Sequence, residues 1–387
     1  MKFSSIEYSI PYVFIFLILF ACAILEQKNI DRIISRNKLR NFAFILVLLF
    51  FGLRGYVASD WISYTHLYRD IVPINQLSLK TFKTITYEPG FLVFTSLIKT
   101  FSDNYIFYSF VNSLVDLLLL RILIKRYCQG YFIFALTIYF VFCGEIEINM
   151  LRNIKAIFLF LLSIKYISER KILPFMLINL VGLSFHNSAI FYFPLYFFIH
   201  KNNQKVYFIF TIIGLIIYFF QIHYLNTITN AMAGFLGGMF AKKNDHYITS
   251  ESSGITFGVL YILIPLYWVF KNYKKIININ ENNLIFVNLF FLYCFSTLYF
   301  SEVLVFRARF SALFSFSLCV LFPLMYLFNR IKINRILIVN FLLVVFVSKL
   351  VLTNTPILNK YDNVIFGITS FEERTKIIEF YYRKLLD

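Results

Sequence analysis

The sequence predicts an all-α, polytopic integral membrane protein, on three observations. Hydrophobic residues make up 59% of the 387 residues, and aromatic residues make up 20%. Apolar runs recur along the whole chain between short charged segments. A soluble domain has too small an interior for this apolar content, whereas helices satisfy their own backbone hydrogen bonds in lipid. Because no separate soluble domain is visible, residues 1–387 are expected to form a single transmembrane domain.

The distribution of charge predicts the orientation in the membrane. The formal net charge is +17, and six short loops hold 19 of the 37 Lys and Arg residues but only 4 of the 20 Asp and Glu residues. These loops are Glu26–Arg40, Arg121–Gly130, Lys165–Lys171, His200–Lys205, Lys271–Asn283 and Asn329–Arg335. Basic loops mark the cytoplasmic side of a membrane protein, so the charge reports topology and predicts no nucleic-acid partner.

About twelve transmembrane helices are predicted from the apolar runs. The predicted spans are Tyr8–Leu25, Asn41–Leu53, Tyr105–Leu120, Tyr131–Cys143, Met150–Ile164, the two arms of Ile172–Ile199, Val206–Leu225, Ile255–Phe270, Leu284–Phe300, Phe310–Phe328 and Ile336–Leu352. The first span precedes the basic loop Glu26–Arg40, so the N-terminus is expected outside. The run Phe91–Phe101 is too short to cross and contains Lys99, so we expect it to be interfacial or re-entrant.

The turns between spans are predicted from the same rule. Ile172–Ile199 is either one tilted helix, which would place every later basic loop outside, or a hairpin. A hairpin with His186 at its outer turn keeps those loops inside, so the charge rule favours it. Shorter outer turns are expected at Gly144–Asn149 and Ser301–Arg309.

Three longer segments are predicted on the outer side. The loop 54–90 is the longest polar insert, and the loop 226–253 contains glycines that suggest a mobile flap. The tail 353–387 ends in Phe371–Leu386, where apolar and charged residues follow helical spacing. This last stretch is expected to be a helix along the membrane interface.

The predicted topology gathers ionisable residues at outer loops or outer span ends. They are Arg54, Asp60, Glu88, Glu145, Glu147, Arg152, His186, Arg307 and Arg309. Ionisable groups near a membrane interior are costly and usually functional. Arginine binds phosphate as a planar fork, and aromatic rings offer apolar faces with polar tips. Together they suit a ligand that carries phosphate and sugar.

Each candidate residue also has a structural interpretation. Arg152 either lines a cavity or extends to the outer headgroups. Arg307 and Arg309 either clasp one pyrophosphate, provided that the backbone there is not helical, or anchor the interface. His186 is a general base or a satisfied structural histidine, and Glu88 is a base or a turn residue.

Motifs of soluble enzymes and of metal sites are absent from the sequence. The five cysteines form no CxxC pair, and there is no GxGxxG, GxxxxGK[ST], HExxH or GxSxG pattern. We therefore expect neither a metal nor a cofactor, and nucleotide substrates are disfavoured. We therefore expect a donor substrate that resides in the membrane in place of a nucleotide.

Four patches of the chain share the pattern of a known family. They are Arg54, Gly55, Asp60, Tyr64 and Tyr68 with Glu88 and Gly90 downstream; Arg152, Asn153 and Ala156 at a helix start; Phe185, His186, Ser188 and Ala189 at a turn; and Arg307 and Arg309 at a span entrance. In these patches the chain resembles the EpsG-like group of Wzy-type polysaccharide polymerases, which make bacterial O-antigen and capsule chains. Asn153 stands where the family more commonly has Gln.

The resemblance implies a metal-independent glycosyltransferase of the bacterial inner membrane, with a helical fold related to the GT-C-like enzymes. A growing glycan would pass from undecaprenyl pyrophosphate to the terminal sugar of a new undecaprenyl-pyrophosphate-linked repeat unit, on the periplasmic face. The implied partners are these lipid-linked oligosaccharides, the lipid bilayer and a chain-length-regulating membrane protein.

The resemblance also implies roles for individual residues. His186 is the first candidate for the base that takes the acceptor proton, with Glu88 or Asp60 behind it. The residues expected to bind substrate are Arg54, Tyr64, Tyr68, Arg152, Arg307 and Arg309. Arg152 and the two arginines of the last patch, Arg307 and Arg309, would stabilise the departing pyrophosphate.

Two other functions remain open. An O-antigen ligase uses the same donor but passes the glycan to lipid A core, and a large late outer loop would favour it. A flippase for lipid-linked oligosaccharides would also have about twelve spans, but its charges would line the whole depth of a cavity. The charges here are expected at one face, which favours the polymerase.

Overall fold

The computed structural model describes residues 2–28, 33–128, 130–236, 254–255, 259–280, 282–328 and 332–386. Within these ranges helices dominate, no strand forms, and the β structure is limited to isolated bridges. The predicted all-α class is confirmed. By its internal contacts the chain divides into two compact units, Met1–Tyr196 with Tyr326–Asp387, and Phe197–Met325. Whether the chain acts as a single transmembrane domain stays a prediction.

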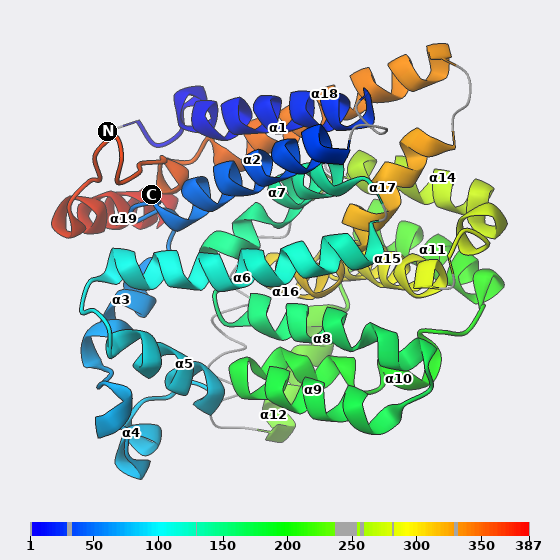
Figure 1. Ribbon diagram of the computed structural model, residues 1–387. Coiled ribbons are helices and arrows are strands. Elements are labelled where there is room, and N and C mark those ends of the chain that lie inside the picture. Colours follow the sequence, from blue (N-terminus) through cyan, green and yellow to red (C-terminus); the bar gives the residue numbers. More distant parts are fainter. Residues whose placement is uncertain are drawn as a thin grey trace. The chain divides into compact units, whose positions relative to one another are not determined.

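Long helices form the first unit (Figure 1). They are α1 (Ile10–Lys28), α2 (Ile33–Gly52), α6 (Tyr105–Tyr127), α7 (Phe132–Asn149), α8 (Asn153–Ser168), α9 (Ile172–Phe185) and α18 (Lys332–Asn354). Helix α1 packs against α2, α7 and α18, while α8 packs against α6 and α9. These contacts bury the aromatic and aliphatic side chains that the sequence places along each helix.

Five described helices are long and apolar enough to cross a bilayer. They are Ile6–Lys28, Tyr105–Tyr127, Phe132–Asn149, Asn282–Tyr299 and Ile336–Asn354. A pair of helices bent by 67°, Leu304–Phe314 with Ser317–Tyr326, would add a sixth. These helices are those of a polytopic membrane protein. The other apolar helices, such as α8 and α9, are shorter than a span requires, so the count of about twelve stays a prediction.

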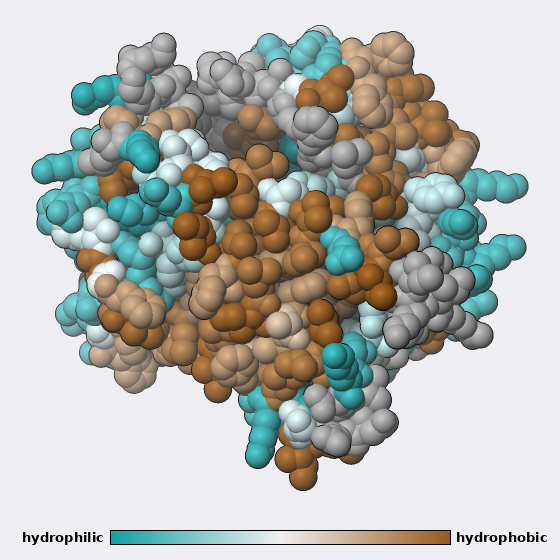
Figure 2. Space-filling view, turned by 90° about the horizontal axis from the view of Figure 1, so that it is seen from above, coloured by the Kyte–Doolittle hydropathy of each residue, from teal (hydrophilic) through white to brown (hydrophobic). Residues whose placement is uncertain are grey.

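The surface beside α1 and α18 carries the pattern of a membrane protein. Viewed from this side, hydrophobic residues form a broad band between hydrophilic ends (Figure 2). Within the 18-residue apolar stretch of each helix, only 39% of the residues in Ile6–Lys28 and 17% of those in Ile336–Asn354 are buried within the protein. Such exposed apolar faces are stable against lipid and not against water.

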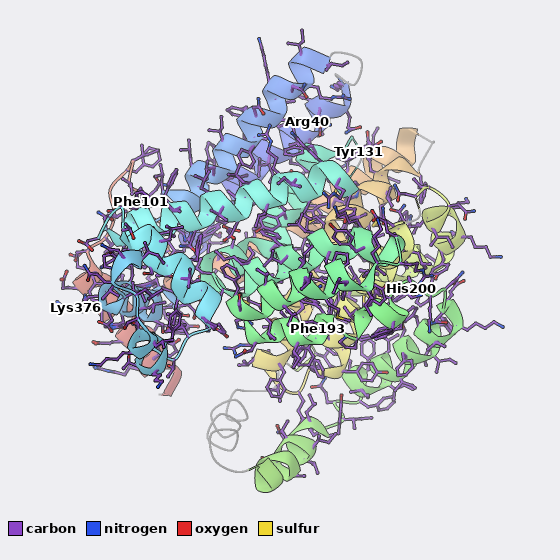
Figure 3. The ribbon with its side chains drawn as sticks, turned by 60° about the horizontal axis from the view of Figure 1, so that its bottom comes forward. Arg40, Phe101, Tyr131, Phe193, His200 and Lys376 are labelled. Atoms are coloured by element: carbon purple, nitrogen blue, oxygen red, sulfur yellow. The ribbon has the colours of Figure 1, made fainter. Side chains whose placement is uncertain are left out.

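Segments predicted on opposite sides of the membrane lie at opposite ends of the first unit. Arg40 and Tyr131 lie at one end, and Phe101 and Lys376 lie at the other (Figure 3). At the basic end, the buried carboxylate of Glu26 pairs with Arg40 and accepts the backbone N–H of Ile133 at 2.9 Å. This contact ties together the predicted cytoplasmic ends of α1, α2 and α7.

The predicted loop 54–90 is folded and not open. It contains α3 (Trp61–Asp70), η2 (Ile74–Gln76) and α4 (Leu79–Thr84), and it leads into α5 (Pro89–Lys99). One face of α3 is apolar at positions 64, 67, 68 and 71, and it packs on α5 and α6 in a buried cluster. Helix α5 has 11 residues, too few to cross a bilayer, which agrees with the interfacial or re-entrant prediction for Phe91–Phe101.

The prediction of an outer turn at Gly144–Asn149 is wrong. Helix α7 continues through Asn149, and the turn comes at Met150. The two glutamates of this stretch suggested exposure, but Glu147 is fully buried, and its Oε2 accepts a hydrogen bond from the Tyr139 hydroxyl at 2.6 Å, about two helical turns back. A buried glutamate that bonds within its own helix is compatible with a helix that continues through this stretch.

The chain reverses at His186, as the hairpin prediction requires. Helix α9 ends at Phe185, and His186 is extended, with φ −157° and ψ 132°. The return arm is η3 (Asn187–Tyr192) followed by α10 (Leu195–Phe198). The rings of Phe175 and Tyr196 lie 5.2 Å apart, so the arms run side by side. The return arm is a 3-10 helix and a single short turn, and not a second long helix.

The second unit is also helical. It contains α11 (Gln204–Phe219), α12 (Leu225–Leu236), α14 (Leu260–Ile277), α15 (Asn282–Tyr299), α16 (Leu304–Phe314) and most of α17 (Ser317–Leu327). Helix α15 packs against α11, α14 and α16. The buried carboxylate of Glu302 accepts the backbone N–H groups of Tyr224 and Leu225 at 2.8 and 2.7 Å, which satisfies the start of α12.

Two outer segments predicted in this unit need correction. The loop 226–253 begins as helix α12, and residues 237–253, where the flap was expected, lie outside the described residues. The turn Ser301–Arg309 ends at Val303, because α16 begins at Leu304. In the tail, α19 (Phe371–Leu386) has the predicted bounds. It lies near the N-terminus of the first unit (Figure 1).

Candidate functional site

An ion pair joins two helix starts in the first unit. Glu88 immediately precedes α5 and Arg152 immediately precedes α8, and Arg152 Nη1 lies 2.5 Å from Glu88 Oε2. Neither side chain caps its own helix, so both are available to each other. The Glu88 side chain is only 9% exposed, whereas that of Arg152 is 26% exposed. The carboxylate is therefore committed to the protein, and the cation is within reach of a ligand.

The same carboxylate holds the turn after α9. Glu88 Oε1 accepts the backbone N–H of Asn187 at 3.3 Å. Gly90 allows this approach, because a Cβ at that position would collide with Ser184 at the end of α9. Glu88 thus links α5, α8 and the His186 turn, three segments that are far apart in the sequence.

His186 belongs to a short chain of hydrogen bonds. Its Nδ1 accepts the backbone N–H of Ser188 at 3.1 Å and lies 2.7 Å from Ser188 Oγ. Ser188 Oγ donates to Asn153 Oδ1 at 2.7 Å. The imidazole is thereby fixed against the first turn of α8, next to Arg152. The hydrogen-bonded residues His186, Ser188 and Asn153, together with Arg152, come from two of the patches that carry the family resemblance.

Two tyrosines complete the surroundings of the guanidinium. Arg152 lies over the Tyr87 ring at 4.7 Å from its centroid. Burial raises the pKa of Tyr64 to about 12, although the nearby Arg152 opposes this shift. Burial also raises the pKa of Tyr87, and the carboxylate of Asp60 raises it further. Both phenols therefore stay protonated at neutral pH and can donate hydrogen bonds.

One donor of the guanidinium is left over. Arg152 Nε is buried and has no hydrogen-bond partner within the protein. Buried donors without partners are uncommon in folded proteins and call for an explanation such as a bound ligand. An anion lying against the exposed edge of Arg152 would supply the missing acceptor.

A second ion pair lies one turn deeper on α8. Lys155 Nζ donates to Asp116 Oδ2 and Asn112 Oδ1, each at 2.9 Å, and to Leu151 O at 3.0 Å. Both charged side chains are at most 4% exposed. All three donors of the ammonium are used within the protein, so this pair braces α8 against α6 and offers nothing to a ligand.

Other predicted site residues of the first unit lie elsewhere. Arg54 is buried and donates to Ser113 Oγ at 2.8 Å and to the carbonyl of Phe51. Tyr68 stacks on Tyr108 with ring centroids 4.5 Å apart. Asp60 is exposed at the start of α3 and reaches the site through its charge. The predicted binding roles of Arg54 and Tyr68 stay predictions.

Arg307 and Arg309 lie in the second unit, on α16. The backbone there is helical, so the condition for a shared pyrophosphate clasp is not met. Side chains two residues apart on an α-helix point about 200° apart. Their separate roles in substrate binding stay predictions.

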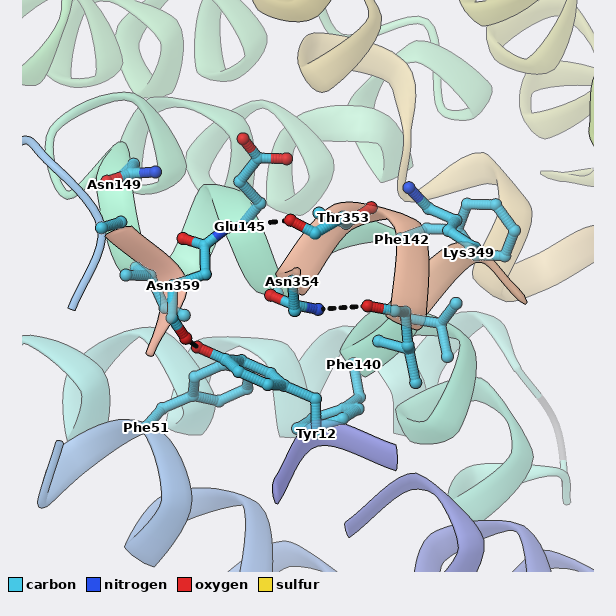
Figure 4. Close-up of a pocket in the computed structure, with 15 residues that line it drawn as sticks. Tyr12, Phe51, Phe140, Phe142, Glu145, Asn149, Lys349, Thr353, Asn354 and Asn359 are labelled. Carbon is cyan, nitrogen blue, oxygen red and sulfur yellow. Dashed lines mark hydrogen bonds between the residues drawn. The ribbon is translucent and has the colours of Figure 1, made fainter. Parts of the chain in front are cut away.

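A small cavity at the outer ends of α7 and α18 is a different feature. It has a volume of about 30 Å³ and is lined by polar side chains that include Glu145, Asn149 and Lys349 (Figure 4). Asn359 crosses it, donating from Nδ2 to Thr353 O at 2.8 Å. The volume suits about one water molecule and not a sugar.

Sequence reasoning did not assign two participants in the site. Tyr87 was not among the predicted site residues, although it directly precedes Glu88. The backbone N–H of Asn187 leaves no sequence signal at all. Among the described residues, no three His, Cys, Asp or Glu side chains gather as metal ligands.

Comparisons with known proteins give one match. A family model described as the EpsG family matches residues 37–363. This range contains the Glu88–Arg152 pair, the His186 turn and both arginines of α16. No curated protein and no solved structure matches the chain.

Proposed function

The chain belongs to the EpsG family, and on that premise we propose that it is a glycosyltransferase that polymerises lipid-linked oligosaccharide repeat units. Family membership indicates a polysaccharide-polymerase-like membrane protein. In the proposed reaction, the growing glycan leaves undecaprenyl pyrophosphate and joins the terminal sugar of a new undecaprenyl-pyrophosphate-linked repeat. The proposed location is the periplasmic face of the inner membrane.

The observation that carries the proposal is the convergence of Glu88, Arg152 and His186. These groups come from three segments and meet at helix ends on the side opposite the basic loops. A glycosyl transfer from a lipid pyrophosphate needs a cation at the leaving group and a base at the acceptor hydroxyl. The cluster supplies both, and Glu88 links them by bonding to Arg152 and to the backbone N–H of Asn187, next to His186.

The cation in this proposal is Arg152. As the bond between the anomeric carbon and the pyrophosphate oxygen breaks, negative charge collects on the pyrophosphate. The guanidinium donates to such oxygens as a fork, and its unpartnered Nε can donate to one of them. Tyr87 and Glu88 hold its orientation from the ring face and from the carboxylate.

The base in this proposal is His186, acting through Nε2. The Ser188 backbone N–H favours the tautomer with the proton on Nε2, which cannot take a proton. The alternative tautomer carries the proton on Nδ1 and donates it to Ser188 Oγ, while that hydroxyl donates to Asn153 Oδ1. The proposed reaction uses this second tautomer, which gives up the hydrogen bond from the Ser188 backbone N–H to Nδ1 and leaves Nε2 able to take the acceptor proton as the new glycosidic bond forms.

Glu88 is the weaker candidate for the base. Its two oxygens already accept hydrogen bonds from Arg152 and from the backbone N–H of Asn187, so both are engaged within the protein. Asp60 is exposed and remains the second candidate.

Deletion of the gene in its host tests the proposal. Surface polysaccharide is then separated on a gel, with the wild-type gene restored on a plasmid as the control. A single repeat on the lipid anchor supports a polymerase. Long unattached chains would show a ligase, and repeats trapped in the cytoplasm would show a flippase, and either result would refute the proposal.

A further inference from the structure

The tail of the first unit presents an apolar turn to its surroundings. The segment Val364–Ile368, here called the tail tip, contains four large hydrophobic residues among five. Phe366 is 89% exposed and Ile365 is 60% exposed, and Val364 and Ile368 are exposed at 45% and 39%. None of residues 363–370 carries a charge. In water such a cluster would lose the free energy that its side chains gain by burial.

The tail tip is held in place by its base. Asn363 and Gly367 form an isolated bridge, and Gly367 adopts φ +101°, a conformation that side-chain-bearing residues rarely take. Val364 N donates to Leu53 O at 2.9 Å, and Phe366 N donates to Asn363 O at 3.0 Å. The exposed turn is therefore a built feature and not the result of a loose chain.

The base of the tail tip sits at the outer ends of α1 and α2. Leu53, which accepts from Val364, directly follows the last residue of α2. Tyr361 stacks on Phe50 of α2 with centroids 4.2 Å apart, and it contacts Tyr12 of α1 at 5.7 Å. The tip therefore begins at the level where two predicted transmembrane helices leave the bilayer.

The start of α1, close to the base of the tail tip, is also apolar and exposed. On the first turns of α1 and just before it, Ile6, Ile10 and Phe14 are 64%, 58% and 61% exposed. Side chains of this kind at the end of a transmembrane helix face lipid. The base of the tail tip contacts this helix through Tyr361 and Tyr12, and Lys360, which is exposed four residues before the tip, suits the headgroup level.

We propose that the tail tip inserts into the outer leaflet of the membrane, beside α1 and α2. Its partner is the lipid surface, with Phe366 and Ile365 among the upper acyl chains and Lys360 at the headgroups. Insertion fixes the tail to the membrane at a second place besides the transmembrane helices. Through the Gly55 N–Asp362 O hydrogen bond of 3.1 Å, it also fixes the start of the 54–90 segment. The proposal does not depend on the proposed function.

A fluorescence experiment on the full chain tests the proposal. All five native cysteines are buried, so Phe366→Cys introduces the accessible thiol for an environment-sensitive label. The matched control is Glu373→Cys, an exposed position on α19 in the same tail. Both proteins are placed in phosphatidylcholine nanodiscs and exposed to two quenchers, iodide in the water and a lipid with a nitroxide near its headgroup. Elution as a single species in size-exclusion chromatography checks the fold of each.

The expected result is opposite behaviour at the two positions. The label at 366 should be quenched several-fold more by the nitroxide lipid than by iodide, with a blue-shifted emission, and the label at 373 should show the reverse. Equal access of iodide to both positions would place the tip in water. A label at 366 that neither quencher reaches would show a protein partner. Either result overturns the proposal.

Discussion

Arg152 and Lys155 stand one turn apart at the start of α8, and each pairs with a carboxylate from another segment. Their surroundings differ. Lys155 is at most 4% exposed and uses all three donors on Asp116, Asn112 and Leu151 O. Arg152 is 26% exposed and has a buried Nε without a partner in the protein. The comparison teaches that an ion pair becomes a brace or a binding site according to whether its donors are already satisfied.

The largest effect is expected at Arg152. Arg152→Ala should abolish chain extension and leave a single repeat on the lipid, because no other residue of the cluster offsets the charge of the pyrophosphate. Loss of one such donor lowers the reaction rate by roughly 10²–10³-fold. Polysaccharide gels give the chain length, and immunoblots of membranes give the amount of protein.

Arg152→Lys is the matched control for this change. It keeps the charge and loses the fork, so short chains should remain. A normal ladder from Arg152→Ala would remove the pyrophosphate assignment.

The next effect is expected at His186. His186→Gln keeps the size of the side chain but removes the base, and general-base catalysis is worth about 10²–10⁴ in rate. The rate of chain growth in membranes should fall within that range, while the thermal unfolding of the purified protein stays unchanged. Asn187→Ala is the control, because Asn187 contacts Glu88 only through its backbone N–H. Equal losses from both changes would indicate a structural turn.

The deeper pair should respond in the opposite way. Lys155→Met leaves Asp116 buried without a cation, which costs about 3–5 kcal/mol of stability. The unfolding temperature in detergent should fall sharply, and the amount of protein in the membrane should fall with it. The double change Lys155→Met with Asp116→Leu removes both charges and should restore most of the stability.

Activity of that double variant sharpens the comparison. If the deeper pair is only a brace, the restored protein should extend chains. A stable but inactive double variant would show that Lys155 takes part in the reaction.

The smallest effect is expected at Tyr87. Tyr87→Leu removes the ring under the Arg152 guanidinium, an interaction worth about 0.5–2 kcal/mol, so the rate should fall several-fold. Tyr87→Phe keeps the ring and should behave nearly as the wild type. The two variants are compared by the rate of chain growth in membranes. An equal loss in both would assign the effect to the hydroxyl and not to the ring.

The sequence identified several residues of the candidate site but did not predict the contacts between them. Glu88, Arg152 and His186 stood out because charged and imidazole groups are rare in an apolar chain. Their mutual arrangement was not predictable, because Glu88 lies 64 residues from Arg152 and joins the His186 turn through a backbone N–H. Arg54 stood out for the same reason, and Tyr68 stood out as an aromatic residue in the charged segment, yet Arg54 bonds to Ser113 and Tyr68 stacks on Tyr108.

The sequence by itself determined the helical class, the bounds of α19 and the chain reversal at His186. In lipid the backbone must satisfy its own hydrogen bonds, which favours helices, and basic loops mark the cytoplasmic side. Local composition is therefore sufficient to predict these features. The tertiary structure alone decided that Gly144–Asn149 stays helical, that residues 54–90 fold and that Arg152 is open while Lys155 is closed. The states of Arg152 and Lys155 depend on polar partners from other segments, and the fold of residues 54–90 depends on apolar packing against α5 and α6. Such partners have no fixed distance along the chain.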